Sequence, residues 1–185
     1  MIKALLYEFM GMIEEEKVEV YNEFSLQHEL GIFLRERLPN YKVQFERNTK
    51  FFGISGTLKH EIDIVIFNDM ERYAIELKYP VNGQYPEQMY SFVKDIIFME
   101  QLKNNGFDAT YCLTMVKDKN FYFGKKTDGI YAYFRGDEIL CGIIEKPTGK
   151  SNESVTLNKS HRIVWEGTTE QLKYYIVDID KSVEI

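Results

Sequence analysis

Apolar positions along this chain of 185 residues change their spacing several times, and each spacing predicts a different element. Up to residue 38 they recur every three to four positions, which is the period of one helix face. The pattern predicts a first helix that begins near Ile2 and ends in three glutamates at 14–16. It predicts a second helix that Ser25 caps and Pro39 stops.

Alternating apolar and polar positions follow and predict strands over 41–47, 61–67 and 72–79. The next helical pattern has Pro86 in its first turn, and Asn-Asn-Gly at 104–106 ends it. A strand over 109–116 completes the order α, α, β, β, β, α, β. This order predicts an α/β (α+β) fold in which helices flank a mixed central sheet.

Beyond about residue 117 the apolar runs become short, and Gly, Asp, Asn and Pro separate them, which predicts a β-rich extension. Arg-Gly-Asp at 135–137 fits a hairpin turn. No internal repeat or long linker is present, so we expect one domain over 1–185, made of a helical addition (1–24), a core (25–116) and the extension (117–185). The strands expected in the extension are 121–123, 130–134, 139–144, 155–157, 162–165 and 174–179.

The formal net charge of −6 excludes a protein whose overall field attracts polyanions, so a nucleic acid partner would need a basic patch or a bridging metal. The charge is uneven, because residues 1–38 hold four Lys/Arg against eight Asp/Glu. A small basic island follows the last strand of the core. Two interpretations of it are open, a solvated loop and a phosphate contact. Its lysines are Lys117, Lys119, Lys125 and Lys126.

Sequence features also bear on the compartment. The two cysteines lie in apolar runs and are too few for a disulfide framework. The N-terminal apolar stretch has the pattern of a helix and lacks the cleavage site of a signal peptide. No run approaches the roughly 18 apolar residues that span a bilayer. We therefore expect a cytoplasmic protein without a membrane partner.

The chemistry is concentrated in one predicted hairpin. If residues 68–71 form its tight connection, paired positions sum to 139 and Asp63 lies opposite Glu76. Strand alternation puts Lys78 on the same face and leaves the other face apolar. Two carboxylates whose Cβ atoms lie about 5 Å apart repel, and a divalent cation such as Mg²⁺ or Mn²⁺ resolves the repulsion. Such an ion and a neighbouring lysine can support phosphodiester hydrolysis.

Asp63, followed after twelve residues by Glu76-Leu77-Lys78 on consecutive strands between two helices, resembles the PD-(D/E)xK nuclease superfamily. The resemblance covers residues 25–116, with Ile62 where the name of the motif has proline. It implies a restriction-endonuclease-like αβββαβ core. It also implies a metal-dependent nuclease that uses Mg²⁺ or Mn²⁺ to hydrolyse DNA.

The resemblance assigns roles to single residues. Asp63, Glu76 and the carbonyl of Leu77 correspond to metal ligands, and Lys78 to the base or electrostatic stabiliser. Glu29, which we expect on the core-facing side of its helix, corresponds to a direct or water-mediated ligand. Gln88 matches a weaker position that supports the site or contacts DNA.

Other interpretations stay open. Glu61 would face Lys78 across the hairpin and could form a plain salt bridge with it. The same fold can also serve as a catalytically inactive module that binds protein or nucleic acid. DNA against RNA, the form of the substrate and a possible homodimer are not decided by the sequence. We expect Asp95 and Glu100 to face solvent, and the three histidines to have surface or capping roles.

Overall fold

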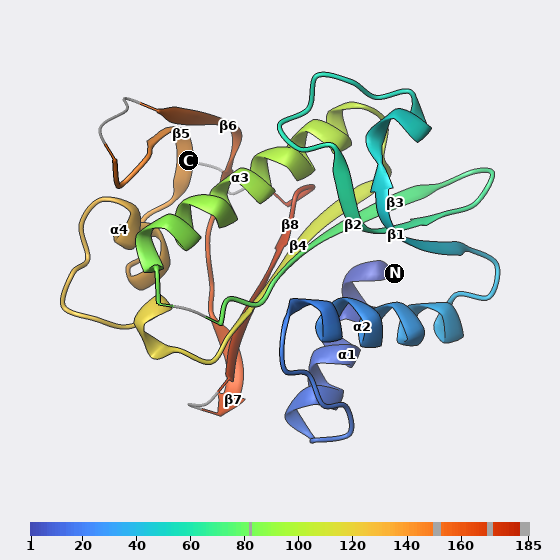
Figure 1. Cartoon of the computed structure of the whole chain (residues 1–185), viewed down its shortest axis with the longest axis horizontal. Coiled ribbons are helices and arrows are strands. Elements are labelled where there is room, and N and C mark those ends of the chain that lie inside the picture. The colour runs from blue at the N-terminus through green and yellow to red at the C-terminus, as the bar shows by residue number, and fades with distance from the viewer. Residues whose placement is uncertain (82, 150–152, 170–171, 182–185) are drawn as a thin grey trace.

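The computed structural model describes residues 1–81, 83–149, 153–169 and 172–181. Its centre is a six-stranded sheet in the order β1-β2-β3-β4-β8-β7, with helices on both faces (Figure 1). β5 and β6 form a separate two-stranded sheet. The elements are α1 (Ile2–Glu14), α2 (Glu23–Arg37), β1 (Lys42–Asn48), η1 (Thr49–Phe52), β2 (Glu61–Phe67), β3 (Arg72–Lys78), α3 (Tyr85–Asn104), β4 (Ala109–Val116), η2 (Lys119–Phe121), α4 (Ile130–Arg135), β5 (Leu140–Glu145), β6 (Ser154–His161), β7 (Glu166–Thr169) and β8 (Leu172–Asp178).

The central sheet is mixed, because β3 and β4 run parallel while the other neighbouring pairs run antiparallel. α3 is the crossover between the two parallel strands. The C-terminal ends of the central strands β3 and β4 therefore lie side by side, and Lys78 pairs with Thr114 there. The expected α/β fold with a mixed central sheet and flanking helices is confirmed.

Each face of the sheet has its own apolar core. α1 and α2 cover one face, and α3 covers the other (Figure 1). α2 packs closely against β1 because Gly31 has no side chain. A methyl group there would lie 2.1 Å from the ring of Phe45. Of the helices within the described residues, none is long and apolar enough to cross a membrane.

The cap of α2 differs from the expected one. Asn22 is the N-cap, and its Oδ1 accepts the backbone N–H of Ser25 at 2.8 Å. Ser25 Oγ in turn accepts the backbone N–H of Asn22 at 3.1 Å. Ser25 is therefore the third residue of α2 and forms a reciprocal capping box with Asn22, so the helix begins two residues before Ser25.

The C-terminal region is less β-rich than expected. Residues 130–134 belong to helix α4, because Ile130 and Phe134 are one turn apart and bury against α3, with the rings of Phe134 and Phe92 5.8 Å apart. Gly136 ends this helix, so 135–137 is not a hairpin turn. Residues 121–123 and 162–165 are not strands. The other expected runs correspond to β5, β6 and β8, and β7 and β8 extend the central sheet.

Candidate active site between β2 and β3

The hairpin has the predicted register. Backbone pairs run from Phe67–Arg72 to Ile64–Ile75, and each pair sums to 139. Beyond Ile64 the bonds between the two strands are made by two side-chain carboxylates with backbone N–H groups. Leu77 N–H donates to Asp63 Oδ2 at 2.7 Å, and Asp63 N–H donates to Glu76 Oε1 at 3.3 Å. Asp63 and Glu76 therefore face each other where the ladder between β2 and β3 opens.

The pairing of β1 with β2 is interrupted at the same level. Glu46 occupies the position opposite Asp63, has a positive φ of 47°, and is skipped in the register. Gln27 of α2 bridges this gap, because its Nε2 donates to Glu46 Oε1 at 2.6 Å and to the carbonyl of Asp63 at 2.8 Å. A non-glycine residue with positive φ is uncommon and tends to occur at functional sites.

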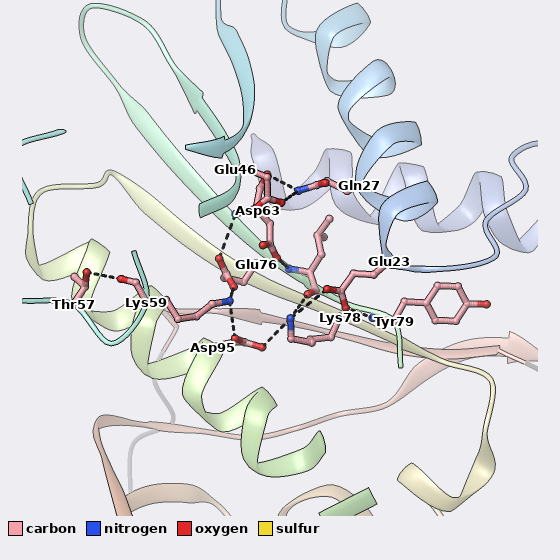
Figure 2. A network of polar contacts seen from close by, with 11 residues as sticks. Glu23, Gln27, Glu46, Thr57, Lys59, Asp63, Glu76, Lys78, Tyr79 and Asp95 are labelled. Carbon is pink, nitrogen blue, oxygen red and sulfur yellow. Dashed lines mark hydrogen bonds and ion pairs between the residues drawn. The ribbon is translucent and has the colours of Figure 1, made fainter. Parts of the chain in front are cut away.

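Two lysines complete the group (Figure 2). The ammonium of Lys59 contacts the Glu76 carboxylate and lies 3.0 Å from Asp95 Oδ1 of α3. Lys78 Nζ lies 3.0 Å from the carbonyl of Leu77, 3.6 Å from Asp95 Oδ2 and 3.5 Å from Glu23 Oε1 of α2. We name Glu23, Asp63, Glu76, Asp95, Lys59 and Lys78 the acidic cluster.

Charge in the acidic cluster is not balanced. Its four carboxylates face two ammonium groups, so its formal charge is −2 when every member is ionised. Burial raises the pKa of Asp63 to about 6 despite the nearby lysines. Burial, followed by the charges of Asp63 and Asp95, raises the pKa of Glu76 well above its ordinary value. Both shifts mean that burial and mutual repulsion disfavour the ionised carboxylates.

The pKa values of the two lysines are also raised, but their cause is the charge of the neighbouring carboxylates. Burial alone would lower the pKa of Lys59, but Asp95, Glu76 and Asp63 together raise it above the ordinary value. For Lys78 the same opposition of burial against Asp95 and Glu23 also gives a raised pKa. Both side chains are therefore cations at neutral pH.

The expected alternative for Lys78 is wrong. Glu61 is exposed, and its backbone pairs with Asn48 of β1. Lys78 instead forms ion pairs with Glu23 and Asp95. The β2–β3 pairing ends at Ile64–Ile75, so the ladder does not continue to Glu61.

Glu29 does not lie where the sequence suggested. Its side chain is 39% exposed and pairs with His28 at 3.5 Å. The carboxylate that α2 brings to the acidic cluster is Glu23, whose Oε2 also accepts the backbone N–H of Tyr79 at 3.1 Å. Glu23 lies seven residues before the buried Leu30, on the same helix face. This spacing is the signal that could have identified it.

Asp95 and Glu100 are buried, contrary to expectation, because the sheet, α4 and the β5–β6 hairpin enclose α3. Glu100 Oε1 lies 2.8 Å from Nε2 of the buried His161, which is therefore not a surface residue. Glu100 also accepts the backbone N–H groups of Asn158 and Lys159. Glu100 and His161 thus join α3 to β6. Among the described residues, no hydrogen bond or ion pair connects this pair to the acidic cluster.

The remaining predicted residues lie on α3 and in the segment that follows β4. Lys117 follows β4 directly, and its Nζ lies 5.8 Å from the ring centre of Tyr79, next to Lys78. Gln88 lies two turns before Asp95, on the same face of α3. The four lysines of the basic island are all exposed. They lie in the segment between β4 and α4.

The donor chemistry of the acidic cluster suits Mg²⁺ or Mn²⁺, which bind oxygen ligands. Asp95 Oδ2 is buried without a hydrogen-bond partner, and the formal charge of −2 equals the charge that a divalent ion would neutralise. A hollow of about 40 Å³ beside Asp63 is lined in part by Leu77, Glu23 and Glu46. Within the described part of the chain, however, no three acidic, His or Cys side chains already converge as a metal-binding group. Lys59 contacts Oε2 of Glu76, one of the two oxygens that this side chain could offer to a metal.

A larger hollow of about 480 Å³ lies elsewhere, between the end of α1, Lys117 and Leu172. Its lining includes none of the acidic cluster.

Comparison with protein-family models, with curated proteins and with solved structures gives no match. The interpretation of the site therefore depends on its own geometry.

Proposed function

We propose that the protein is a metal-dependent nuclease that hydrolyses DNA phosphodiester bonds, and that residues 25–116 form a restriction-endonuclease-like core. The observation that carries the proposal is that Asp63 and Glu76 meet where the β2–β3 ladder opens, with Lys78 two residues beyond Glu76 on β3. The order α2, β1, β2, β3, α3, β4, with β3 parallel to β4, supports the αβββαβ arrangement.

In this proposal Asp63, Glu76 and the carbonyl of Leu77 hold the ion, and Glu23 takes the role that the sequence suggested for Glu29. The chemistry that Mg²⁺ or Mn²⁺ supplies in such a site is polarisation of a phosphoryl oxygen and activation of water. Glu46 and Gln27 fix the main chain of Asp63 from the side of α2.

Lys78 is assigned as an electrostatic stabiliser rather than a base. Its pKa is raised, so its side chain stays protonated and cannot accept a proton at neutral pH. Its ammonium lies 3.0 Å from the carbonyl of Leu77, within reach of a phosphate bound at the same place. A fixed positive charge there stabilises the negative charge that grows on the phosphate in the transition state.

One observation favours the second candidate, an inactive module that binds protein or nucleic acid. Lys59 already neutralises Glu76 and contacts Asp95, so part of the acidic cluster is satisfied without a metal. In this alternative the cluster only holds β2, β3 and α3 together. Cleavage and Asp63-dependent metal binding would both be absent.

A cleavage assay separates the two candidates. The purified protein is incubated with Mg²⁺ or Mn²⁺ and with duplex, branched and single-stranded DNA, and RNA of matching sequence. We expect cleavage of at least one DNA form that Asp63→Asn abolishes and the exposed control Glu61→Gln retains. Equal cleavage by wild type and Asp63→Asn would contradict the proposal.

A further inference from the structure

Lys59 lies outside the motif but inside the acidic cluster. It belongs to the loop between η1 and β2, and its ammonium contacts Glu76, whose side chain is fully buried. The Lys59 side chain itself is 30% exposed. A cation with access to solvent therefore neutralises a carboxylate that the proposed function assigns to the metal.

The main chain around Lys59 is held in place. Thr57 Oγ1 donates to the carbonyl of Lys59 at 2.6 Å, and Leu58 N–H donates to Gln101 Oε1 of α3 at 2.7 Å (Figure 2 shows the first of these bonds). A change in the contact between Lys59 and Glu76 therefore needs only a rotation of the lysine side chain. The four-carbon stem of lysine has the freedom for such a rotation.

Asp95 offers the displaced ammonium a second partner. Its Oδ1 is 3.0 Å from Lys59 Nζ, and its buried Oδ2 has no hydrogen bond and lies 3.6 Å from Lys78 Nζ. Lys59 can therefore release Glu76 and keep Asp95. The exchange leaves neither the lysine nor Asp95 as an unpaired buried charge, which would be costly.

We propose that Lys59 is a tethered counter-ion of Glu76 that a divalent cation displaces, and that Asp95 retains the lysine after the exchange. Lys59 then weakens metal binding by competing for Glu76, and holds the acidic cluster together when no metal is bound. The inference rests on the proposed function, because it takes Asp63 and Glu76 as the metal ligands. Lys59 is a positioning residue in this scheme.

Mn²⁺ binding tests the competition. Calorimetry at pH 8 on the full chain compares wild type with Lys59→Met, Lys59→Arg and Lys78→Met. Lys78→Met is the charge-matched control: it removes one positive charge from the same cluster, and its lysine contacts the Leu77 carbonyl, Glu23 and Asp95 but not Glu76 in the described structure. We expect Lys59→Met to bind Mn²⁺ at least about tenfold more tightly than wild type and more tightly than Lys78→Met. Lys59→Arg should stay near wild type.

A measurement on the wild-type protein does not depend on a variant that folds. Acetic anhydride labelling followed by mass spectrometry gives the reactivity of each lysine with and without Mn²⁺. We expect saturation with Mn²⁺ to raise the labelling of Lys59 and to leave the exposed Lys17 unchanged. Asp63→Asn, which should not bind Mn²⁺, should show no such rise.

The outcomes separate this inference from the function beneath it. If calorimetry detects no heat of Mn²⁺ binding to wild type, or detects the same heat for Asp63→Asn, the proposed function fails and the inference fails with it. If that heat is present but Lys59→Met binds no more tightly than wild type or Lys78→Met, only the inference is overturned. Labelling of Lys59 that stays constant or falls on addition of Mn²⁺ also overturns it.

Discussion

Asp63 and Glu76 are joined through the main chain, with Leu77 N–H bonded to Asp63 Oδ2 at 2.7 Å and Asp63 N–H bonded to Glu76 Oε1 at 3.3 Å. Each carboxylate thus accepts a backbone N–H from the opposite strand. Both of these bonds come from main-chain donors of β2 and β3, in addition to the contact of Glu76 with Lys59. This fixes the carboxylates before any ligand arrives, as a metal-binding or catalytic site requires.

Stability of the metal-free protein should depend on pH through Asp63. Its pKa is about 6 in the folded protein and roughly 3.9 in an unfolded chain, so ionisation of Asp63 costs stability as the pH rises through 6. With a chelator present, Asp63→Asn should be more stable than wild type at pH 7.5 by about 1–3 kcal/mol. Urea unfolding at pH 7.5 and 4.5 checks this, and the advantage should shrink at the lower pH. A variant less stable than wild type at pH 7.5 would argue against an ionic cost at this position.

Removal of the Lys78 charge should affect chemistry more than metal binding. Lys78→Met should reduce the single-turnover cleavage rate by about 10²-fold or more, because it removes a fixed charge beside the reacting phosphate. Mn²⁺ calorimetry should still detect binding in this variant. Lys78→Arg, which keeps the charge, should retain more activity. Cleavage by Lys78→Met at the wild-type rate would exclude the electrostatic role.

Glu100 should be a structural residue whose loss weakens the whole protein. Glu100→Ala leaves the buried His161 and two backbone N–H groups without their partner, and should destabilise by about 3–5 kcal/mol. Glu61→Ala, at an exposed position, should cost less than about 0.5 kcal/mol. Urea unfolding at neutral pH compares the two. Equal stability of the two variants would contradict a structural role for the Glu100–His161 pair.

The same pair has a pH dependence of opposite sign to that of Asp63. Burial alone would raise the pKa of Glu100, but the bonds from His161, Asn158 and Lys159 lower it below the ordinary value. The ionised Glu100 carboxylate therefore contributes its full stabilisation above the pKa of glutamate in the unfolded chain. This stabilisation is lost as the pH falls through the lowered pKa of Glu100 in the folded protein. The stability gap between wild type and Glu100→Ala should narrow in acid. A gap that widens in acid would contradict this assignment.

DNA affinity should fall steeply with salt if the basic island contacts phosphates. Each lysine that makes such a contact contributes about 0.9 to the slope of log affinity against log salt. Replacement of Lys117 and Lys119 by Gln should lower the slope, measured by fluorescence anisotropy with Ca²⁺ in place of Mg²⁺. Lys17→Gln, beside Glu15 on the surface, is the control. An unchanged slope would favour the solvated-loop interpretation.

Much of the β2–β3 hairpin could be predicted from the sequence. A tight connection at 68–71 and strict alternation leave one register that buries the apolar face, and this register is observed. α3 and β4 were also predicted, because their apolar runs are long and clearly bounded. The position of Asp63 opposite Glu76 follows from the tight connection at 68–71 and from the register.

The parts that the sequence did not predict depend on contacts between distant elements. Residues 130–134 have the composition of a strand, yet packing of Phe134 on Phe92 makes them helical. Glu100 has the pattern of a solvent-facing charge because β6, which covers it, comes much later in the chain. Asp95 is buried against Lys59 and Lys78, whose positions its own helix does not indicate. Lys59 carries no motif, and only the path of its loop brings it to Glu76. The spacing of Glu23 from Leu30 could have placed Glu23 on the core-facing side of α2, but the spacing argument from the sequence selected Glu29 instead.

The central claim is that the acidic cluster cleaves DNA with a divalent metal, and one measurement tests it most directly. Single-turnover cleavage in Mg²⁺ is compared for wild type, Glu76→Gln and the exposed control Glu61→Gln on the best DNA substrate, with a chelated sample beside them. We predict that Glu76→Gln and the chelated sample lose at least about 10³-fold in rate while Glu61→Gln stays near wild type. Cleavage by Glu76→Gln at the wild-type rate would contradict the claim, as would the absence of cleavage by the wild-type protein on every DNA form.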